Sequence, residues 1–163
     1  MHTTSGRLAA SGLRITRQRV AVLDVITPGE HLDVETVADR ARHQLGALST
    51  QAVYDVLRAL GTAGLVRRIE PAGQPALYEI RVGDNHHHLV CRSCHTVVDI
   101  DCVTGSAPCL DALLPAGFLA DEAEVTWWGQ CAECRATGAS GRTDSAIPKT
   151  TPPATPRRRG HHD

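Results

Sequence analysis

Large apolar side chains are scarce in this chain of 163 residues, which contains two tryptophans, two tyrosines, one phenylalanine and one methionine. Hydrophobic residues still make up 42% of the chain, so a core can form. A small domain with few aromatics often needs a bound metal or another cross-link. The chain also lacks an apolar run of 18 residues and a signal-peptide pattern. We therefore expect a soluble, cytoplasmic protein without a membrane partner, made of one ordinary domain or two small ones.

Charge is unevenly distributed along the chain, so the net charge of −1 neither supports nor excludes nucleic-acid binding. Residues 1–85 carry ten arginines and nine acidic residues, a net charge of +1. Residues 86–135 carry two arginines and seven acidic residues, a net charge of −5, and residues 136–163 carry five basic and two acidic residues, a net charge of +3. The acidic middle part suits cation binding, whereas DNA binding by the first part would depend on locally clustered arginines.

Four helices and a hairpin are expected in the first 80 residues. Apolar residues at helical spacing predict the helices, of which the first lies at residues 8–12 and the second ends at Pro28-Gly29. The fourth is followed by Gly64, a suitable residue just beyond a helix end. Apolar runs at 65–69 and 76–80, separated by turn-forming residues, predict the hairpin. The N-cap residues of the second, third and fourth helices are Thr16, Asp33 and Ser49.

Helices followed by a hairpin form the outline of a winged helix, a relative of the helix-turn-helix. In this arrangement the fourth helix enters the major groove, where Gln and Arg bond to base edges and Thr and Tyr reach phosphates. A plain helical domain with solvated polar faces is the alternative. The candidate DNA-binding residues are Arg14, Arg19, Thr50, Gln51, Tyr54, Arg58 and Arg67.

Two Cys-x-x-Cys pairs, Cys91/Cys94 and Cys131/Cys134, have 36 residues between them. Each pair can chelate from a tight turn, and four thiolates complete the shell of a structural Zn²⁺. Such a site contributes on the order of 10 kcal/mol to folding. A rubredoxin-like iron centre or metal-free buried cysteines are the alternatives. The small α/β domain around this site is expected to have strands at 88–92, 96–100 and 122–128 and a helix at 106–114.

Three consecutive histidines precede the first cysteine pair. In a strand, His86 and His88 point to one face and His87 to the other, so His86 and His88 can share a metal ion. Imidazoles combined with carboxylates suit a labile divalent ion such as Fe²⁺ or Mn²⁺. The sequence therefore predicts a second, exchangeable metal site. The residues that can complete it are Glu79 and Asp99, from adjacent strands, and His31, from a loop between helices.

Cys102 and Cys109 lie outside the paired motifs, where they can form a thiol switch or be small, partly buried residues. The last 28 residues contain four prolines, no aromatics and many small polar residues, which predicts a disordered tail. The expected fold class is α+β. The expected divisions are a winged-helix domain at 1–81, a hinge at 82–85, a metal-binding α/β domain at 86–135 and the tail at 136–163.

Residues 8–135 together resemble the ferric uptake regulator family of bacterial metal-dependent repressors. The resemblance rests on Leu-Arg-Ile-Thr-x-Gln-Arg at 13–19, Ser-Thr-Gln-Ala-Val-Tyr at 49–54, His-His-His-Leu-Val-Cys-x-x-Cys at 86–94 and the final Cys-x-x-Cys. It implies a non-enzymatic homodimer whose winged-helix domains bind palindromic double-stranded operator DNA. It also implies that the domain at 86–135 is the dimerisation domain.

The resemblance further implies a regulatory Fe²⁺ or Mn²⁺ site that spans both domains, so that metal binding would fix their relative orientation. Aspartate at position 99 resembles the peroxide-sensing branch, especially actinobacterial regulators of catalase-peroxidase genes, whereas iron sensors usually have glutamate. In that branch, iron-catalysed oxidation of His31 or His86 would release the repressor. The ligands carried over are His31, Glu79, His86, His88 and Asp99.

Three other functions remain open at this stage. An iron-level sensor would bind metal reversibly without oxidation, and a thiol-based repressor would use Cys102 and Cys109. A zinc hydrolase or deaminase is disfavoured, because the chain lacks His-x-Glu and His-Glu-x-x-His motifs and a four-thiolate site has no open position. The chain also departs from the family in two places: His95 replaces the usual glycine after Cys94, and residues 122–124 lack the histidine of a further iron-sensor site.

Overall fold

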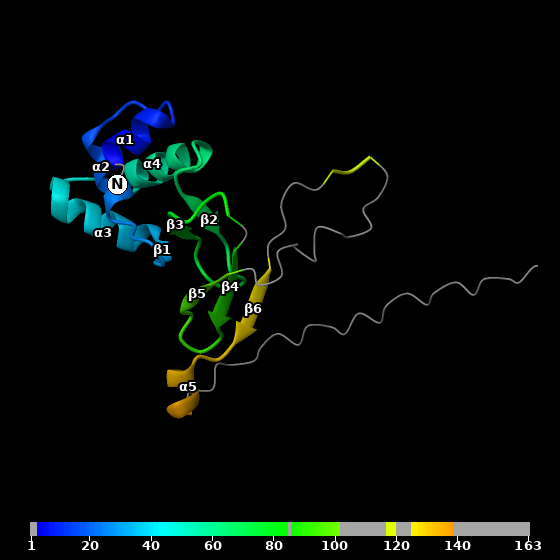
Figure 1. Ribbon diagram of the computed structural model, residues 1–163. Helices are drawn as coiled ribbons and strands as arrows, with labels where there is room; N and C mark the ends of the chain where they lie inside the picture. The colour runs from blue at the N-terminus through cyan, green and yellow to red at the C-terminus, as the bar shows by residue number, and fades with distance from the viewer. Residues whose placement is uncertain (1–2, 85, 102–116, 120–124, 139–163) are drawn as a thin grey trace, which may run out of the picture.

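The computed structural model describes residues 3–84, 86–101, 117–119 and 125–138, which form two groups of elements (Figure 1). The first group contains helices α1 (Thr4–Ala10), α2 (Arg17–Asp24), α3 (Val34–Leu45) and α4 (Thr50–Thr62) and strands β1 (Leu32–Asp33), β2 (Arg67–Ile69) and β3 (Leu77–Glu79). The second contains strands β4 (His86–Cys91), β5 (Val97–Asp101) and β6 (Thr126–Gly129) and helix α5 (Ala132–Ala136). The fold is therefore α+β, and no helix in the described ranges is long and apolar enough to span a membrane.

Three helices begin at the predicted N-cap residues. The side chains of Thr16, Asp33 and Ser49 each accept a hydrogen bond from the backbone N–H three residues further on. Each bond satisfies one of the donors that the first helical turn leaves open. Gly64 follows the C-cap residue of α4 with a φ of 65°, which confirms its predicted place beyond the helix end.

The first two helices differ from their predicted bounds. Helix α1 begins at Thr4 instead of residue 8, because the side chain of Thr3 caps it by accepting a hydrogen bond from Gly6 N–H. Helix α2 ends at Asp24, before the predicted stop at residue 28. Ile26 therefore lies in the following loop, although it is buried in the core as its apolar character predicted.

The first sheet has the antiparallel strand order β1-β3-β2. The β2–β3 pair is the predicted hairpin. Strand β1 was not predicted, because a strand of two residues shows no alternation of apolar and polar residues. Leu32 of β1 pairs with Tyr78 of β3, which places the preceding residue, His31, beside the end of β3. Helices α2, α3 and α4 pack on one another, α3 also contacts β1, and together with this sheet they form a winged helix.

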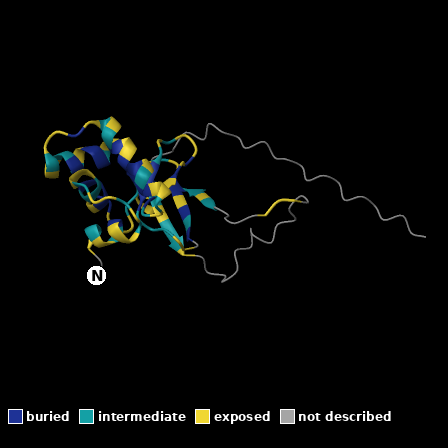
Figure 2. Cartoon of the chain, turned by 90° about the horizontal axis from the view of Figure 1, so that it is seen from above, coloured by how far each residue is buried: buried dark blue, intermediate teal, exposed yellow. Residues whose placement is uncertain are grey.

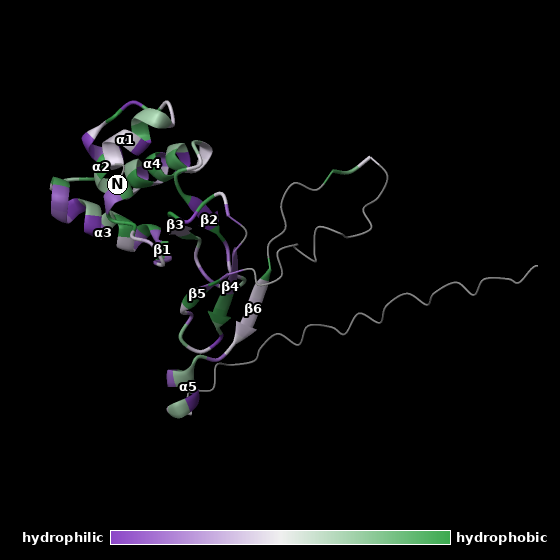
Figure 3. Ribbon diagram, viewed as in Figure 1, coloured by the Kyte–Doolittle hydropathy of each residue, from purple (hydrophilic) through white to green (hydrophobic). Residues whose placement is uncertain are grey.

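The main core lies within this first group. Its buried apolar residues come from α1–α4 and the loops and strands next to them, and they include Leu8, Val37, Val53 and Leu60, which have no exposed surface. Buried residues alternate with exposed ones along the helices (Figure 2), and apolar residues alternate with hydrophilic ones along α3 and α4 (Figure 3). This pattern is the helical periodicity from which the helices were predicted.

The second sheet has the order β5-β4-β6, with β5 antiparallel and β6 parallel to β4. Its strands overlap the three predicted segments, but β4 begins at His86, two residues before the predicted start, and β6 begins only at Thr126, since Val125 is described and lies outside the strand. In the described part of this group, the buried apolar residues are Val90, Cys91 and Cys134. So small a core favours stabilisation by a cross-link. The predicted helix at 106–114, Cys102 and Cys109 lie outside the described residues.

Candidate metal centres

The four motif cysteines come together where β4 ends and α5 begins. Cys91 is the last residue of β4, and its pairing with Gly129 of β6 brings the second Cys-x-x-Cys alongside the first. Cys131 is the N-cap residue of α5, and its thiol accepts a hydrogen bond from the N–H of Cys134. The four Sγ atoms lie within 4.8 Å of one another, and none forms a disulfide.

The sulfur spacing matches a tetrahedral metal site. The Sγ atoms of Cys94 and Cys131 are 3.8 Å apart. Sulfurs bound about 2.3 Å from a central Zn²⁺ would be separated by about 3.8 Å along each edge of the tetrahedron. A disulfide would bring the sulfurs much closer. The cluster therefore fits one four-coordinate ion with no position left for a substrate.

The thiols differ widely in acidity, although they lie close together. Hydrogen bonds from the backbone N–H groups of Cys131 and Cys94 lower the pKa of Cys91 to about 6. Interaction with the Cys131 thiol, together with burial, raises the pKa of Cys134 to about 12. Four adjacent thiolates repel one another, so a bound cation is needed for all four to be deprotonated together.

His95 takes over the conformation of the glycine that the family usually has after Cys94. Its φ is 65°, in the left-handed region, and its N–H donates to the Cys91 carbonyl oxygen. Among the described residues it is the one non-glycine residue with positive φ. His95 is exposed, and the cluster of potential ligands does not include it. The turn after Cys94 therefore forms with a histidine in a conformation that favours glycine, and the four clustered thiols are its only potential metal ligands among the described residues.

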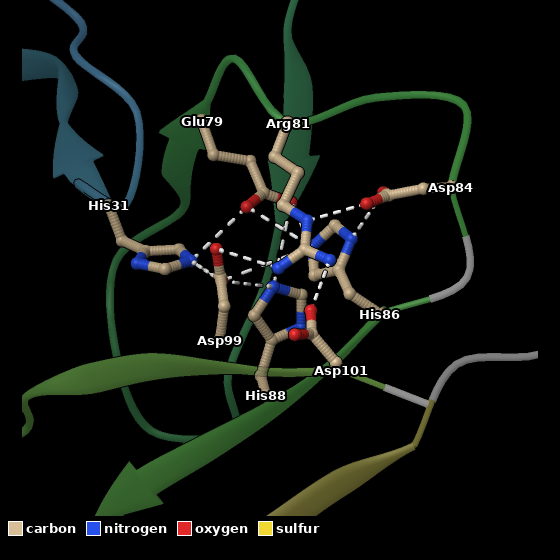
Figure 4. A network of polar contacts seen from close by, with 8 residues as sticks. All are labelled: His31, Glu79, Arg81, Asp84, His86, His88, Asp99 and Asp101. Atoms are coloured by element: carbon tan, nitrogen blue, oxygen red, sulfur yellow. Dashed lines mark hydrogen bonds and ion pairs between the residues drawn. The ribbon is translucent and has the colours of Figure 1, made fainter. Parts of the chain in front are cut away.

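A second cluster lies between the two sheets (Figure 4). His31 reaches it from the loop before β1, and Glu79 from the end of β3. His86 and His88 alternate along β4 and point to the same side, as predicted, and His88 pairs in register with Asp99 of β5. Glu79, His86 and His88 are each at most 2% exposed, which is rare for polar residues without a specific role.

The polar atoms of this cluster converge. His31 Nε2 lies 2.8 Å from Asp99 Oδ1 and 3.2 Å from Glu79 Oε2. His88 Nε2 lies 3.5 Å from Glu79 Oε1 and 3.8 Å from Asp99 Oδ1. Ligand atoms of these four residues lie within 4.8 Å of one another. His86 Nε2 lies at the edge of the group, 3.2 Å from Glu79 and 4.0 Å from Asp99.

The cluster is chemically suited to a divalent ion. His31 Nε2 and Asp99 Oδ1 are buried, yet neither makes a hydrogen bond of acceptable geometry, although they are close to each other. Burial favours a raised pKa for Glu79, but contacts with His31 and His88 outweigh it and lower the pKa to about 2. Burial opposes protonation of His31, but Glu79 and Asp99 raise its pKa. A divalent ion in place of that proton would satisfy all of these groups.

A set of charged residues beside this cluster was not predicted from the sequence. Arg81 and Asp84, which were assigned to the winged-helix domain and the hinge, lie next to the ligands with Asp101 of β5. The only local signal was the Arg-x-x-Asp spacing at 81–84, which is common on protein surfaces. His87 faces the other side of the sheet, as the strand alternation predicted.

The candidate DNA-binding residues lie on the surface of the first group. Gln51, Tyr54 and Arg58 are exposed on α4, and Arg58 pairs with Asp55. Together with residues in and next to the β2–β3 hairpin, which is the wing of the winged helix, they line a groove of about 540 Å³. Thr50 is half-buried, and its hydroxyl accepts a hydrogen bond from Arg42. Arg14 is exposed, whereas Arg19, which donates to the Arg14 carbonyl oxygen, and Arg67 of β2 are partly buried.

Known proteins resemble the chain in sequence and in structure. The transcriptional regulator FurA of Mycobacterium tuberculosis is 56% identical over 128 residues, which cover 78% of this chain and 87% of FurA. The Pseudomonas aeruginosa ferric uptake regulator, solved with manganese, is 25% identical, with a TM-score of 0.61 and coverage of 79% of this chain and 98% of that one. The Campylobacter jejuni peroxide stress regulator is 23% identical, with a TM-score of 0.57 and coverage of 80% and 95%.

The model of the ferric uptake regulator family matches residues 10–104, which include most of the winged helix, the three histidines and the first cysteine pair. The second cysteine pair follows the matched range and completes the thiol cluster. The match and the identity to FurA lead to one conclusion: this chain belongs to the ferric uptake regulator family.

Proposed function

We propose that this protein is a metal-dependent repressor that binds palindromic operator DNA as a homodimer and is released by peroxide. One observation carries the proposal: a single buried cluster takes His31 and Glu79 from the winged helix and His86, His88 and Asp99 from the second sheet. An ion held there would join the two parts and favour one relative orientation. We propose the parts as domains at 1–81 and 86–135, joined by a hinge at 82–85.

The two clusters would hold different ions. Four cysteine sulfurs at tetrahedral spacing suit a permanent, structural Zn²⁺. The nitrogen and oxygen cluster suits Fe²⁺ or Mn²⁺, which exchange more readily. The relative from Pseudomonas aeruginosa, solved with manganese, supports Mn²⁺ as an ion that this second site can bind.

The surface of the first group supports DNA binding through α4. Tyr54 and Arg58 extend from its exposed face, and Gln51 lies one turn earlier. This placement lets the helix present base-contacting side chains to a major groove, while arginines of the β2–β3 hairpin reach the phosphate backbone of the DNA. The proposed DNA contacts are Arg14, Arg19, Thr50, Gln51, Tyr54, Arg58 and Arg67.

A row of exposed apolar residues supports the homodimer. Leu89 of β4 is paired with Val98 on one side and Trp127 on the other, and all three are at least 39% exposed. Three adjacent apolar side chains on one face of a sheet are typical of a surface that another element or chain covers.

Peroxide release would depend on the histidines of the second cluster. A bound Fe²⁺, held by these residues, would supply the one-electron chemistry that makes peroxide reactive beside the imidazoles. In the net reaction the O–O bond of peroxide and one ring C–H bond of His31 or His86 would break. One oxygen would stay on the ring, which is oxidised by two electrons, and the other would leave as water with no net change at the iron. The oxidised ring is a poor ligand, so the ion would dissociate and would no longer join the winged helix to the second sheet. An iron-level sensor without this oxidation remains the second candidate, since the same cluster would bind iron reversibly.

Metal-dependent operator binding tests the proposal, and the two faces of β4 provide matched variants. We expect His88→Ala to abolish the gain in operator affinity that Mn²⁺ produces, a factor of about 5–150 if the coupling is typical. His87→Ala changes a histidine on the opposite face of the same strand and should retain the gain. Operator titrations with and without Mn²⁺ measure it. Equal behaviour of the two variants would contradict the proposed site.

Exposed α4 residues provide a second test. Tyr54→Phe and Arg58→Ala should each weaken operator binding, by about 1–3 kcal/mol where a base contact is lost, without changing metal content. Arg135→Ala removes an exposed arginine from α5 and serves as the control. Gel-shift titration compares the three variants. Unchanged affinity of both α4 variants would exclude α4 from the DNA contact.

A further inference from the structure

Arg81 contacts three carboxylates that come from different places in the chain (Figure 4). Its Nε lies 2.6 Å from Asp84 Oδ2, and its Nη2 lies 2.6 Å from Asp101 Oδ1. Its Nη1 lies 3.6 Å from Asp99 Oδ2. The planar guanidinium presents its N–H groups in fixed directions, so it can bind several carboxylates with a defined geometry. Arg81 thereby connects the end of the first group to β5.

The contact with Asp99 gives the two oxygens of that carboxylate different partners. Oδ1 faces the metal cluster, 2.8 Å from His31 Nε2, whereas Oδ2 faces Arg81. A carboxylate held in this way offers one oxygen to an ion in the cluster. Without Arg81, the side chain could rotate and offer both oxygens.

The contact with Asp84 orients a second ligand. Asp84 Oδ1 lies 2.8 Å from Nδ1 of His86, while Oδ2 of the same carboxylate binds Arg81. When the N–H at His86 Nδ1 donates a hydrogen bond to Asp84, the other ring nitrogen, Nε2, carries the free lone pair. Nε2 faces Glu79 at 3.2 Å. A carboxylate that binds the far nitrogen of a histidine commonly sets the orientation and tautomer of a metal ligand.

We propose that Arg81 is a positioning residue of this metal site. It holds Asp99 as a ligand through one oxygen and, through Asp84, holds His86 with Nε2 toward the ion. The inference rests on the proposed function, since it assumes that the second cluster binds a divalent ion. Arg81 would touch neither the ion nor a ligand atom that faces it.

Charge and positioning predict opposite effects of removing Arg81, which makes the inference testable. A guanidinium repels a nearby divalent cation, so if charge were its only effect, a neutral residue would strengthen metal binding. If Arg81 positions two ligands, its loss weakens binding, by about 10–100-fold for a typical outer-shell residue. The sign of the change in Kd therefore separates the two roles.

The test compares Arg81→Met and Arg81→Lys with the unaltered zinc-loaded protein, using Mn²⁺ alone as the probe. Free Mn²⁺ is measured by electron paramagnetic resonance during titration. We expect both variants to bind about 10–100-fold more weakly, because a lysine ammonium restores the charge without the geometry of the guanidinium. Mn²⁺ binding by Arg81→Met that is equal or tighter would overturn the inference. Full restoration by Arg81→Lys would also overturn it, because a point charge would then be enough.

Asp101→Asn is the matched control, because it changes the carboxylate that pairs with Arg81 and leaves the backbone pairing of residue 101 with His86 in place. Asp101 is 84% exposed, and an exposed ion pair contributes little. We expect its Kd to change by less than about five-fold. A larger change would indicate that the whole network, instead of the Asp99 and Asp84 contacts, sets the affinity, and would contradict the assignment.

X-ray absorption of the Mn²⁺-loaded proteins provides a readout that a general loss of stability would not reproduce. The carboxylate carbon of Asp99 should lie closer to Mn²⁺ in Arg81→Met, where both oxygens can bind, than in the unaltered protein. An identical Asp99 mode would overturn that part of the inference. Zinc content and thermal unfolding verify that the variants are folded. If His88→Ala leaves Mn²⁺ binding intact, the proposed function fails; if it abolishes binding while Arg81→Met does not weaken it, only the role of Arg81 fails.

Discussion

Replacing Cys131 with serine is expected to remove most of the zinc and to unfold the second group of elements. The described part of that group buries few apolar side chains, chiefly Val90 and two of the cysteines, so its apolar core contributes little to stability. A structural zinc site contributes on the order of 10 kcal/mol, comparable to the whole stability of an ordinary domain. Because the exposed row at Leu89, Val98 and Trp127 lies on the same sheet, dimerisation should be lost as well.

Metal analysis, thermal unfolding and sedimentation measure these three effects of Cys131→Ser. Cys102→Ser is the control, since it removes a thiol that belongs to neither Cys-x-x-Cys pair, and it should keep its zinc. A Cys131→Ser protein that remains a folded dimer with a full zinc content would show that the four-thiolate site is assigned wrongly.

Asp99→Glu is expected to keep metal-dependent operator binding and to lose much of its sensitivity to peroxide. Asp99 Oδ1 lies 2.8 Å from Nε2 of His31, 3.8 Å from Nε2 of His88 and 4.0 Å from Nε2 of His86. A side chain one methylene longer would fill or distort the position where peroxide must arrive. An increase of about 1.4 kcal/mol in the barrier would raise the required peroxide dose about ten-fold.

Release of a labelled operator against peroxide dose, with iron loaded anaerobically, measures this difference. The protein with Mn²⁺ should already be insensitive, since Mn²⁺ does not drive the same one-electron chemistry. The double variant Cys102→Ser, Cys109→Ser should respond as the unaltered protein does. Equal sensitivity of Asp99→Glu and the unaltered protein, with loss only in the cysteine variant, would assign the response to the thiols. A mass gain of one oxygen on a histidine peptide would distinguish peroxide sensing from reversible iron sensing.

The local features of the fold were predictable because their causes are local. The side chain of a threonine, aspartate or serine caps a helix by accepting a hydrogen bond from the N–H three residues further on, which is a contact within one helical turn. This rule predicted the N-cap residues Thr16, Asp33 and Ser49. Strand alternation placed His86 and His88 on one face by the same kind of reasoning. The four-cysteine site was predictable because each pair is itself a chelating turn.

Features that depend on distant parts of the chain were missed. Strand β1 exists because Leu32 finds a partner in β3, and its own two residues carry no strand signal. The parallel pairing of β6 with β4 joins segments that are far apart in the sequence, so neither segment alone could predict it. Arg81 was predicted only as the last residue of the winged-helix domain, because only the folded chain brings Asp99 and Asp101 beside it. The edge position of His86 in the ligand cluster also required the structure.

A ligand cluster that draws on both parts of the protein has a reciprocal consequence. If the ion raises the affinity for the operator by some factor, thermodynamic linkage requires the operator to raise the affinity for the ion by the same factor. His31 and Asp99, one from each part, are then held together more firmly on DNA than in solution. As the metal supply falls, repressors free in solution would give up their ions first. The molecules seated on their operators would be the last to lose theirs, so the unbound pool would buffer the genes against brief shortages.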